Sequence, residues 1–67
     1  MITIFFGFLP GVVQQYDLPT GATLEEAIQL IRPDVPPASV RVLVNGTSVE
    51  DLTSLVEAGQ TIRISRL

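Results

Sequence analysis

Few side chains in this sequence could carry out chemistry. Histidine, cysteine and lysine are absent, so catalysis near neutral pH would have to use carboxylates or the single tyrosine, Tyr16. Four of the seven acidic residues form two adjacent pairs, Glu25 with Glu26 and Glu50 with Asp51. Neighbouring residues on a helix point about 100° apart, and a lone acidic pair seldom completes a calcium or magnesium shell. We interpret Glu25 and Glu26 as capping residues, and Glu50 and Asp51 as residues that either solvate a turn or cap the short segment beginning at Leu52. We expect no catalytic residue, no metal and no cofactor.

The charge balance argues against nucleic acid as a partner. Seven carboxylates and four arginines give a net charge of −3. Nucleic-acid binders depend largely on phosphate neutralisation, which this balance does not favour. Hydrophobic residues make up 46% of the chain and charged residues only 16%, against about 25% in an average soluble protein. This apolar excess reflects either an interface with a protein partner or a dense core in a small volume.

The apolar segment 2–9 does not have the features of a targeting or membrane sequence. No basic residue precedes it and no small-residue cleavage site plainly follows it. It is also far too short to span a bilayer. We therefore expect a soluble cytoplasmic protein without membrane contact.

Hydrophobic periodicity predicts the elements that position these side chains. The length suits one small domain, which we assign to residues 1–67. Alternation of apolar and polar residues, interrupted by glycine and proline, predicts strands at 1–6, 12–18, 40–44, 48–49 and 61–66. Pro10-Gly11 favours a type II turn, in which Gly11 has a positive φ. Asn45-Gly46 predicts a type I′ hairpin.

A single helix is predicted between the second and third strands. Thr23 and Glu26 have the spacing of a capping box, and Pro33 ends the helix. The helix presents one apolar stripe to the sheet, formed by Leu24, Ala27, Ile28 and Ile31. Beyond the fourth strand, three residues are expected to close the core, namely Leu52, Leu55 and Val56. The order of elements predicts an α+β fold, a ubiquitin-like β-grasp whose mixed sheet of four to five strands carries one helix on one face.

The other face of such a sheet is left uncovered. If the first and last strands lie side by side in the centre, with the third beside the last, their outward residues share one surface. These residues are Thr3, Phe5, Arg41, Leu43, Arg63 and Ser65. Aromatic and guanidinium groups are enriched in interface hot spots, so we predict partner binding around Phe5, Arg41, Leu43 and Arg63. The alternative is a solvated outer face kept polar by its two arginines.

Other candidate contacts lie at the ends of strands. Phe8 and Leu9 form an apolar pair at a hairpin tip, where they either fold back over the open end of the core or insert into a neighbouring protein. Arg66, next to Leu67, is a candidate to dock in a partner, although terminal residues ordinarily fray. A free sheet edge, formed by the second or the fourth strand, would also permit homo-oligomers.

Three motifs carry a resemblance to a known family, and the match spans nearly the whole chain. They are residues 18–24 entering the helix, Val44-Asn45-Gly46 followed by Val49, and residues 58–62 entering the last strand. In these motifs the chain resembles the thiamine sulfur carrier and the small subunit of molybdopterin synthase. Gln60 stands where members of that family usually carry an acidic residue.

In that family the last strand leads to a C-terminal Gly-Gly that is adenylated and then thiocarboxylated. The present sequence has no glycine beyond Gly59, so the resemblance assigns carrier chemistry to none of its residues. We therefore expect a non-enzymatic interaction module, a small subunit or adaptor of a larger assembly. Two alternatives stay open. One is a sulfur carrier whose diglycine tail is missing from this sequence, and the other is a phage tail-assembly or structural component, located in the virion.

Overall fold

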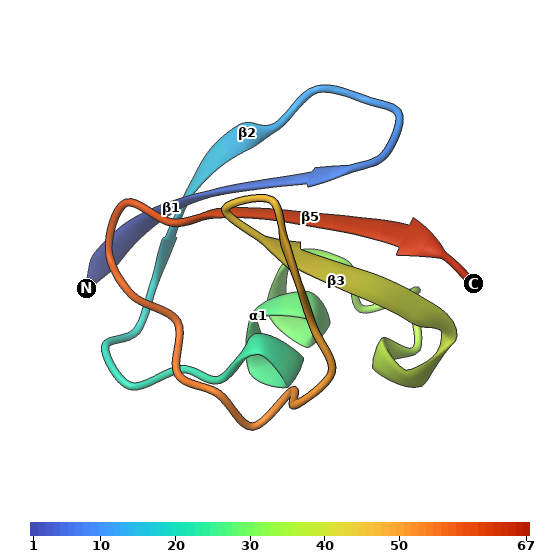
Figure 1. Ribbon diagram of the computed structural model, residues 1–67. Coiled ribbons are helices and arrows are strands. Elements are labelled where there is room, and N and C mark those ends of the chain that lie inside the picture. Colours follow the sequence, from blue (N-terminus) through green and yellow to red (C-terminus); the bar gives the residue numbers. More distant parts are fainter.

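The structure, a computed structural model, describes all residues from Met1 to Leu67. In chain order its elements are β1 (Ile2–Phe8), β2 (Gln14–Leu18), α1 (Leu24–Ile31), the 3₁₀ helix η1 (Pro37–Ser39), β3 (Val40–Val44), β4 (Thr47–Val49) and β5 (Thr61–Arg66). The strands form one mixed sheet in the order β2-β1-β5-β3-β4, with α1 against one face (Figure 1). β1 and β5 run parallel, whereas the other pairs are antiparallel. This is an α+β fold with the parallel pair of a β-grasp, as predicted.

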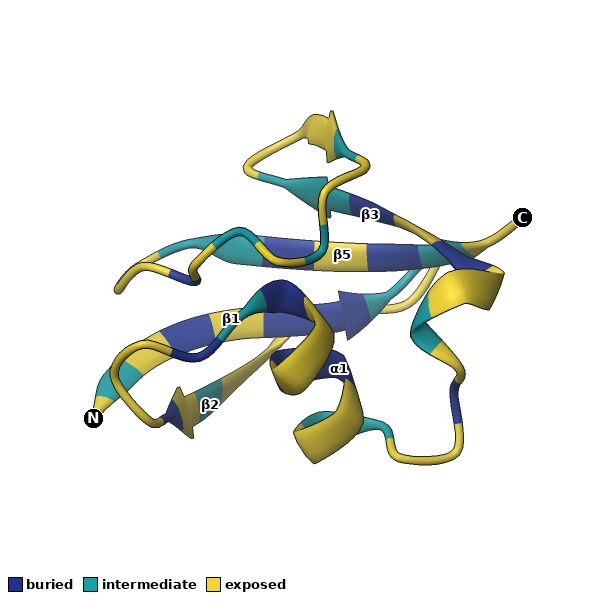
Figure 2. Cartoon of the chain, turned by 90° about the horizontal axis from the view of Figure 1, so that it is seen from below, coloured by how far each residue is buried: buried dark blue, intermediate teal, exposed yellow.

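Buried and exposed residues alternate along the two central strands, β1 and β5, so the two faces of the sheet differ. Ile4 on β1, and Ile62 and Ile64 on β5, point toward α1 and are fully inaccessible to solvent. Figure 2 views the sheet from the side of the helix and shows α1 in front of β1. The predicted apolar stripe of the helix is confirmed, because Leu24, Ala27 and Ile28 are buried and Ile31 packs against the core.

The N-terminus of α1 has all its backbone donors paired. Thr23 Oγ1 accepts a hydrogen bond from the Glu26 N–H (3.2 Å), and the Glu26 carboxylate accepts one from the Thr23 N–H (3.1 Å), which confirms the capping box. The N–H groups of Leu24 and Glu25 donate to carbonyls of the segment between β4 and β5, at 3.0 Å each. The N-terminal end of α1 is therefore attached to the segment between β4 and β5 and has no free backbone donor.

Neither helix is long and apolar enough to cross a membrane.

The hairpin between β3 and β4 has the predicted turn. Asn45 (φ 51°) and Gly46 (φ 86°) both have positive φ, as a type I′ turn requires. Asn45 also binds β5, because its side-chain Oδ1 accepts from the Thr61 N–H at 2.9 Å and its own N–H donates to the Thr61 carbonyl at 2.8 Å. This residue thus sets both the hairpin and the register of β3 against β5.

The hairpin between β1 and β2 differs from the prediction. β1 continues to Phe8, two residues further than expected, and β2 begins only at Gln14. The predicted type II turn is wrong, because Gly11 does not have a positive φ. The turn is closed by a hydrogen bond of 2.6 Å from the Gly11 N–H to the Phe8 carbonyl, across a cis Leu9–Pro10 bond. Proline is therefore the third residue of the turn, not the second.

One of the three residues expected to close the core points to solvent. Val56 is buried and Leu52 packs against the core, but Leu55 is 63% exposed. The backbone of Leu55 forms a β-bridge with Thr23, and the Val56 N–H donates to the Ala22 carbonyl at 2.8 Å. In this locally extended segment successive side chains point to opposite sides, so only one of the two neighbours can enter the core.

Candidate protein-binding face

The sheet face opposite α1, here called the open face, has no covering element (Figures 1 and 2). The predicted strand order places Phe5, Arg41, Leu43 and Arg63 on this face, on three adjacent strands. Arg63 lies directly opposite Leu43 in the β3–β5 register, and Phe5 lies opposite Thr61 in the β1–β5 register. These four residues therefore form one continuous surface across the centre of the sheet.

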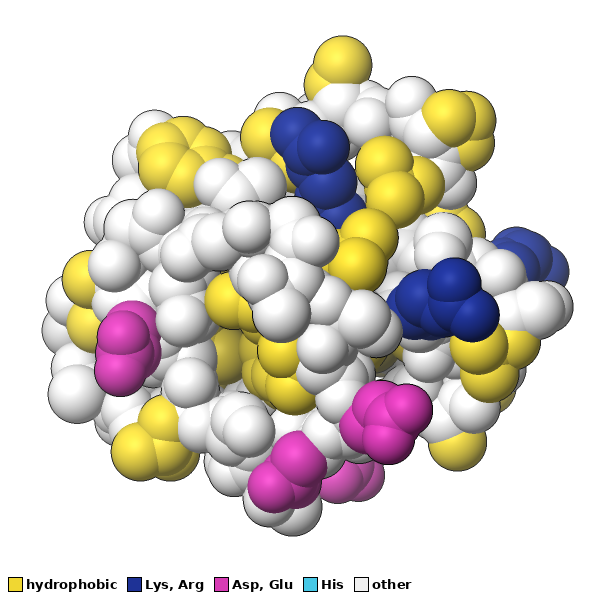
Figure 3. All heavy atoms as spheres, in the orientation of Figure 1, with side chains coloured by type: hydrophobic (Ala, Val, Ile, Leu, Met, Phe, Trp, Pro, Cys, Tyr) yellow, Lys and Arg dark blue, Asp and Glu magenta, His cyan; other side chains and the backbone are white.

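The open face combines partly exposed apolar groups with free positive charge. The exposed fraction of Phe5 is 36%, Leu43 is half-buried, and Arg41 and Arg63 are exposed. Neither arginine forms an ion pair, because the single salt bridge of the protein joins Arg32 to Asp34. Figure 3 shows arginines beside hydrophobic groups in the upper right part of the molecule, whereas the visible carboxylates lie lower and to the left.

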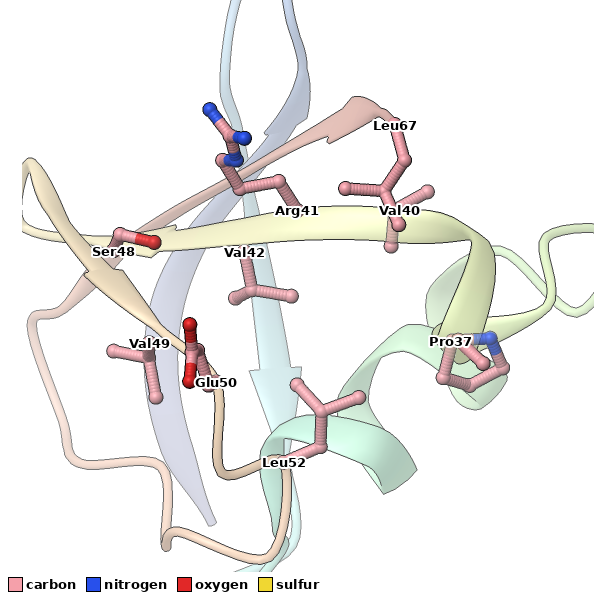
Figure 4. A pocket seen from close by; sticks show the side chains of 10 residues that line it. Pro37, Val40, Arg41, Val42, Ser48, Val49, Glu50, Leu52 and Leu67 are labelled. Atoms are coloured by element: carbon pink, nitrogen blue, oxygen red, sulfur yellow. The ribbon is translucent and has the colours of Figure 1, made fainter.

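Two carboxylates border the open face, Asp17 on one side and, on the other, Glu50, which follows β4 and lines, together with Arg41, a hollow of about 290 Å³ (Figure 4). Asp17 projects from the edge strand β2, where its Oδ1 accepts a hydrogen bond from the Thr3 hydroxyl at 2.8 Å. β1 separates Asp17 from Arg63 on β5, and both β1 and β5 separate it from Arg41 on β3. The charge over β3 and β5 is thus positive although the whole chain carries −3. An acidic partner surface would be complementary to this part of the sheet.

Val13 also borders the open face, and the sequence did not identify it. A Cβ atom at Gly7 would lie 2.6 Å from the Val12 carbonyl oxygen, 2.8 Å from Val13 Cα and 2.9 Å from Val13 Cγ1. The returning arm of the hairpin therefore crosses Gly7 at a distance that no side chain would permit. The signal available in the sequence was a glycine at an outward position, which is typical of a close backbone approach within a strand.

Phe8 belongs to a different surface from the open face. It is half-buried on the helix side of the sheet, and its ring centroid lies 5.4 Å from the Arg32 guanidinium carbon and 5.8 Å from that of Arg66. Of the two alternatives, Phe8 thus folds back over the end of the core. Leu9 extends the β1–β5 ladder, because its N–H donates to the Ile64 carbonyl at 2.8 Å. The seven candidate residues therefore fall into two groups, Phe5, Arg41, Leu43 and Arg63 on the open face and Phe8, Leu9 and Arg66 at the end of β1 and β5.

The pKa shifts of three titratable groups, Arg32, Asp34 and Asp51, each have a local cause. Arg32 donates two hydrogen bonds to Asp34, at 3.1 and 3.0 Å, and these lower the pKa of Asp34 and raise that of Arg32. Asp51 accepts from the hydroxyl of Thr53 and from its N–H at 3.0 Å, and the pKa of Asp51 is lowered as a result. The interpretation of Asp51 as a cap is thus confirmed. Nowhere do three or more acidic side chains gather closely enough to hold a metal ion.

Gln60, where the sulfur carriers usually have an acidic residue, has a local role. Its side-chain Oε1 accepts a hydrogen bond from the Glu57 N–H at 2.9 Å, in the turn before β5. A carboxylate could accept the same bond, so the difference at this position is compatible with the same turn.

Comparisons with protein-family models and with curated proteins find no match. The α+β fold and the geometry of its open face are therefore the basis for assigning a function.

Proposed function

We propose that this protein is a non-enzymatic ubiquitin-like interaction module, a small subunit or adaptor of a larger assembly, which binds an acidic protein surface through its open face. The observation that supports this most is the placement of Phe5 and Leu43 beside two arginines that have no carboxylate partner. The parallel β1–β5 pair and the type I′ turn at Asn45-Gly46 support the resemblance to the sulfur carriers, which stays a prediction.

The chemistry of the open face specifies its partner. Phe5 and Leu43 lose contact with water when a second surface covers them, and apolar burial contributes about 25 cal/mol per Å² before the costs of association. Arg41 and Arg63 each present a planar guanidinium that can bind a carboxylate through two parallel hydrogen bonds. The complementary surface therefore carries an apolar side chain flanked by carboxylates.

The remaining side chains give no support to catalysis. No polar or charged side chain is buried. The groups with shifted pKa values are Arg32, Asp34 and Asp51, and each shift follows from a hydrogen bond to a neighbouring residue. The pKa values of catalytic groups are typically shifted by burial in a cleft together with a specific charge partner, which is not the case for these residues.

Paired substitutions test this proposal. Phe5→Ser with Leu43→Ser removes the apolar part of the open face, and the matched control, Leu30→Ser with Leu55→Ser, removes two leucines that are 60% and 63% exposed elsewhere. Proteins that co-purify with the tagged chain from its native source are identified by mass spectrometry, and the affinity of each is then measured. The open-face variant should bind at least about 30-fold more weakly, which corresponds to about 2 kcal/mol for a hot-spot pair. The control should bind normally.

A charge reversal provides the second part of this test. Arg63→Glu should weaken the same complex, and added salt should weaken the complex of the unsubstituted protein, because exposed charges are screened. Retention of the same partners by the Phe5→Ser, Leu43→Ser variant, or equal loss in the Leu30→Ser, Leu55→Ser control, would show that the open face is not the binding site.

A further inference from the structure

β2 is the first strand in the order of the sheet, so one of its two edges has no neighbouring strand. β1 lies along its other edge, with Thr3 opposite Asp17 and Phe5 opposite Gln15. Gln15 and Asp17 are exposed, and Tyr16 between them is half-buried. The sheet therefore ends in an edge along which another extended segment can pair.

The backbone groups of Gln15 and Asp17 point to this free edge. On β1, the Phe5 N–H donates to the segment just before β5 and the Thr3 carbonyl accepts from it, so both residues direct their backbone groups away from β2. In an antiparallel pair, residues opposite each other either exchange both backbone hydrogen bonds or exchange none. Gln15 and Asp17 therefore form no backbone bond with β1, and no turn or loop supplies a partner for their N–H and C=O groups.

A second copy of this chain is complementary to the edge. When two β2 strands lie antiparallel with Tyr16 opposite Tyr16, each Gln15 lies opposite Asp17 of the other copy. Each of these two pairs exchanges two backbone hydrogen bonds, so every free backbone group of both residues finds a partner.

Neighbouring registers are less complementary. A register centred on Asp17 brings two carboxylates together and places Gln15 opposite Pro19, which has no N–H. A register centred on Gln15 places Asp17 opposite Val13, which lies outside β2 and packs against Gly7. The register centred on Tyr16 is thus the one that pairs the edge within the bounds of β2.

The side chains are complementary in the same register. Gln15 and Asp17 lie on the open face, and directly opposite residues share a face of the sheet. The Gln15 amide can therefore donate to Asp17 of the other copy, whose carboxylate has two oxygens and accepts one hydrogen bond, from Thr3, within its own chain. On the helix side the two Tyr16 rings meet, and each already packs edge-on against Phe6 with ring centroids 6.3 Å apart.

We infer that this protein forms a weak two-fold dimer in which β2 pairs antiparallel with β2 of a second copy, centred on Tyr16. The two sheets then form one continuous sheet, and the two open faces lie side by side on it. Pairing of two strands of five residues buries less than the about 1,200 Å² of a stable interface, so association is expected near millimolar protein. The dimer uses the edge of β2 and does not depend on binding at the open face.

Sedimentation equilibrium and ¹⁵N NMR from about 50 μM to about 2 mM protein test the inference. The apparent mass should rise above the 7.3 kDa of one chain as the concentration increases. Hydrogen exchange of the Gln15 and Asp17 amides should slow by at least about twofold at the highest concentration, because they gain backbone partners. The Tyr16 amide, which faces β1, should exchange at an unchanged rate.

Substitutions at Gln15 test the register. Gln15→Glu places a carboxylate opposite Asp17 in both symmetric pairs and should weaken the dimer at least about tenfold, whereas Gln15→Lys should strengthen it. Gln29→Glu and Gln29→Lys make the same changes of net charge on the exposed side of α1 and are the matched controls. The ¹⁵N spectrum reports whether each variant is folded. A monomer at about 2 mM, concentration-dependent shifts confined to surfaces other than β2, or equal effects of the Gln15 and Gln29 substitutions would each overturn the inference.

Discussion

At the scale of single residues, Gly7 shapes the open face by having no side chain. Val12 and Val13 cross this position so closely that even a methyl group would meet backbone atoms at 2.6 and 2.8 Å. We predict that Gly7→Ala destabilises the protein by about 1–3 kcal/mol, since backbone cannot move aside as a flexible side chain can. Urea unfolding measures this loss. Ser65→Ala, on the same face, is the control and should change stability little; an unchanged midpoint for Gly7→Ala would contradict the close crossing.

Two aspartates predict how stability responds to acid. Hydrogen bonds from Arg32 lower the pKa of Asp34, and those from Thr53 lower the pKa of Asp51, both relative to the ordinary value of 3.8. A carboxyl whose pKa is lower in the folded state stabilises the fold fully above the unfolded pKa and loses this contribution as the pH falls through the folded pKa. Stability should therefore decrease as the pH is lowered below about 4.

Urea midpoints measured between pH 2 and pH 6 test this dependence. The variant with Asp34→Asn and Asp51→Asn should show a smaller loss of stability on acidification than the unsubstituted protein. Asp17→Asn is the comparison variant, because it alters a carboxylate whose hydrogen bond comes from the Thr3 hydroxyl alone. An equally steep loss in the double variant would show that these two aspartates are not responsible.

The role of Phe8 could not be read from its sequence neighbours. Its ring lies near Arg32 at the end of α1 and Arg66 at the end of β5, which are 24 and 58 positions away along the chain. Such a stack depends on the parallel pairing of β1 with β5, so no local pattern predicts it. The same holds for Val13, which borders the open face because of a chain crossing.

At the scale of elements, the start of α1 is the feature most strongly specified by local sequence. Thr23→Ala should destabilise the protein by about 1 kcal/mol, because the Glu26 N–H loses its acceptor. Glu26→Gln should retain most of the stability, since glutamine also closes a capping box. Urea unfolding at neutral pH compares the two variants. Equal stability of Thr23→Ala and the unsubstituted protein would mean that the box contributes nothing.

Elements with local signals were predicted with their observed bounds, and elements without them were not. The capping box, the Asn45-Gly46 turn and the alternation in residues 61–66 each determine backbone conformation within a few residues, and α1, β3 and β5 follow the prediction. The prediction for the first hairpin was wrong because Pro10 can occupy either central position of a turn. The prediction that Leu55 closes the core was wrong because the direction of its side chain is set by the bridge to Thr23, which is a tertiary contact.

At the scale of the whole molecule, the fold separates charge as well as apolar surface. Three of the four arginines make no ion pair, and two of these lie on the open face of a chain whose net charge is −3. Under the proposed function, such a distribution would orient an acidic partner toward the sheet rather than the helix. The open face could be predicted because strand order alone places its residues together. The hollow of about 290 Å³ lined by Pro37, Val42 and Leu52 could not, because its walls come from segments that are far apart in the sequence.

The most direct test is a cross-saturation NMR measurement on the complex of the labelled protein with its co-purified partner, since it identifies the amides that lie against the partner. We predict the strongest signal loss at Phe5, Leu43 and Arg63, with the exposed side of α1 around Gln29 and Leu30 unaffected. Loss centred on the helix, with the open face unchanged, would contradict the proposed function.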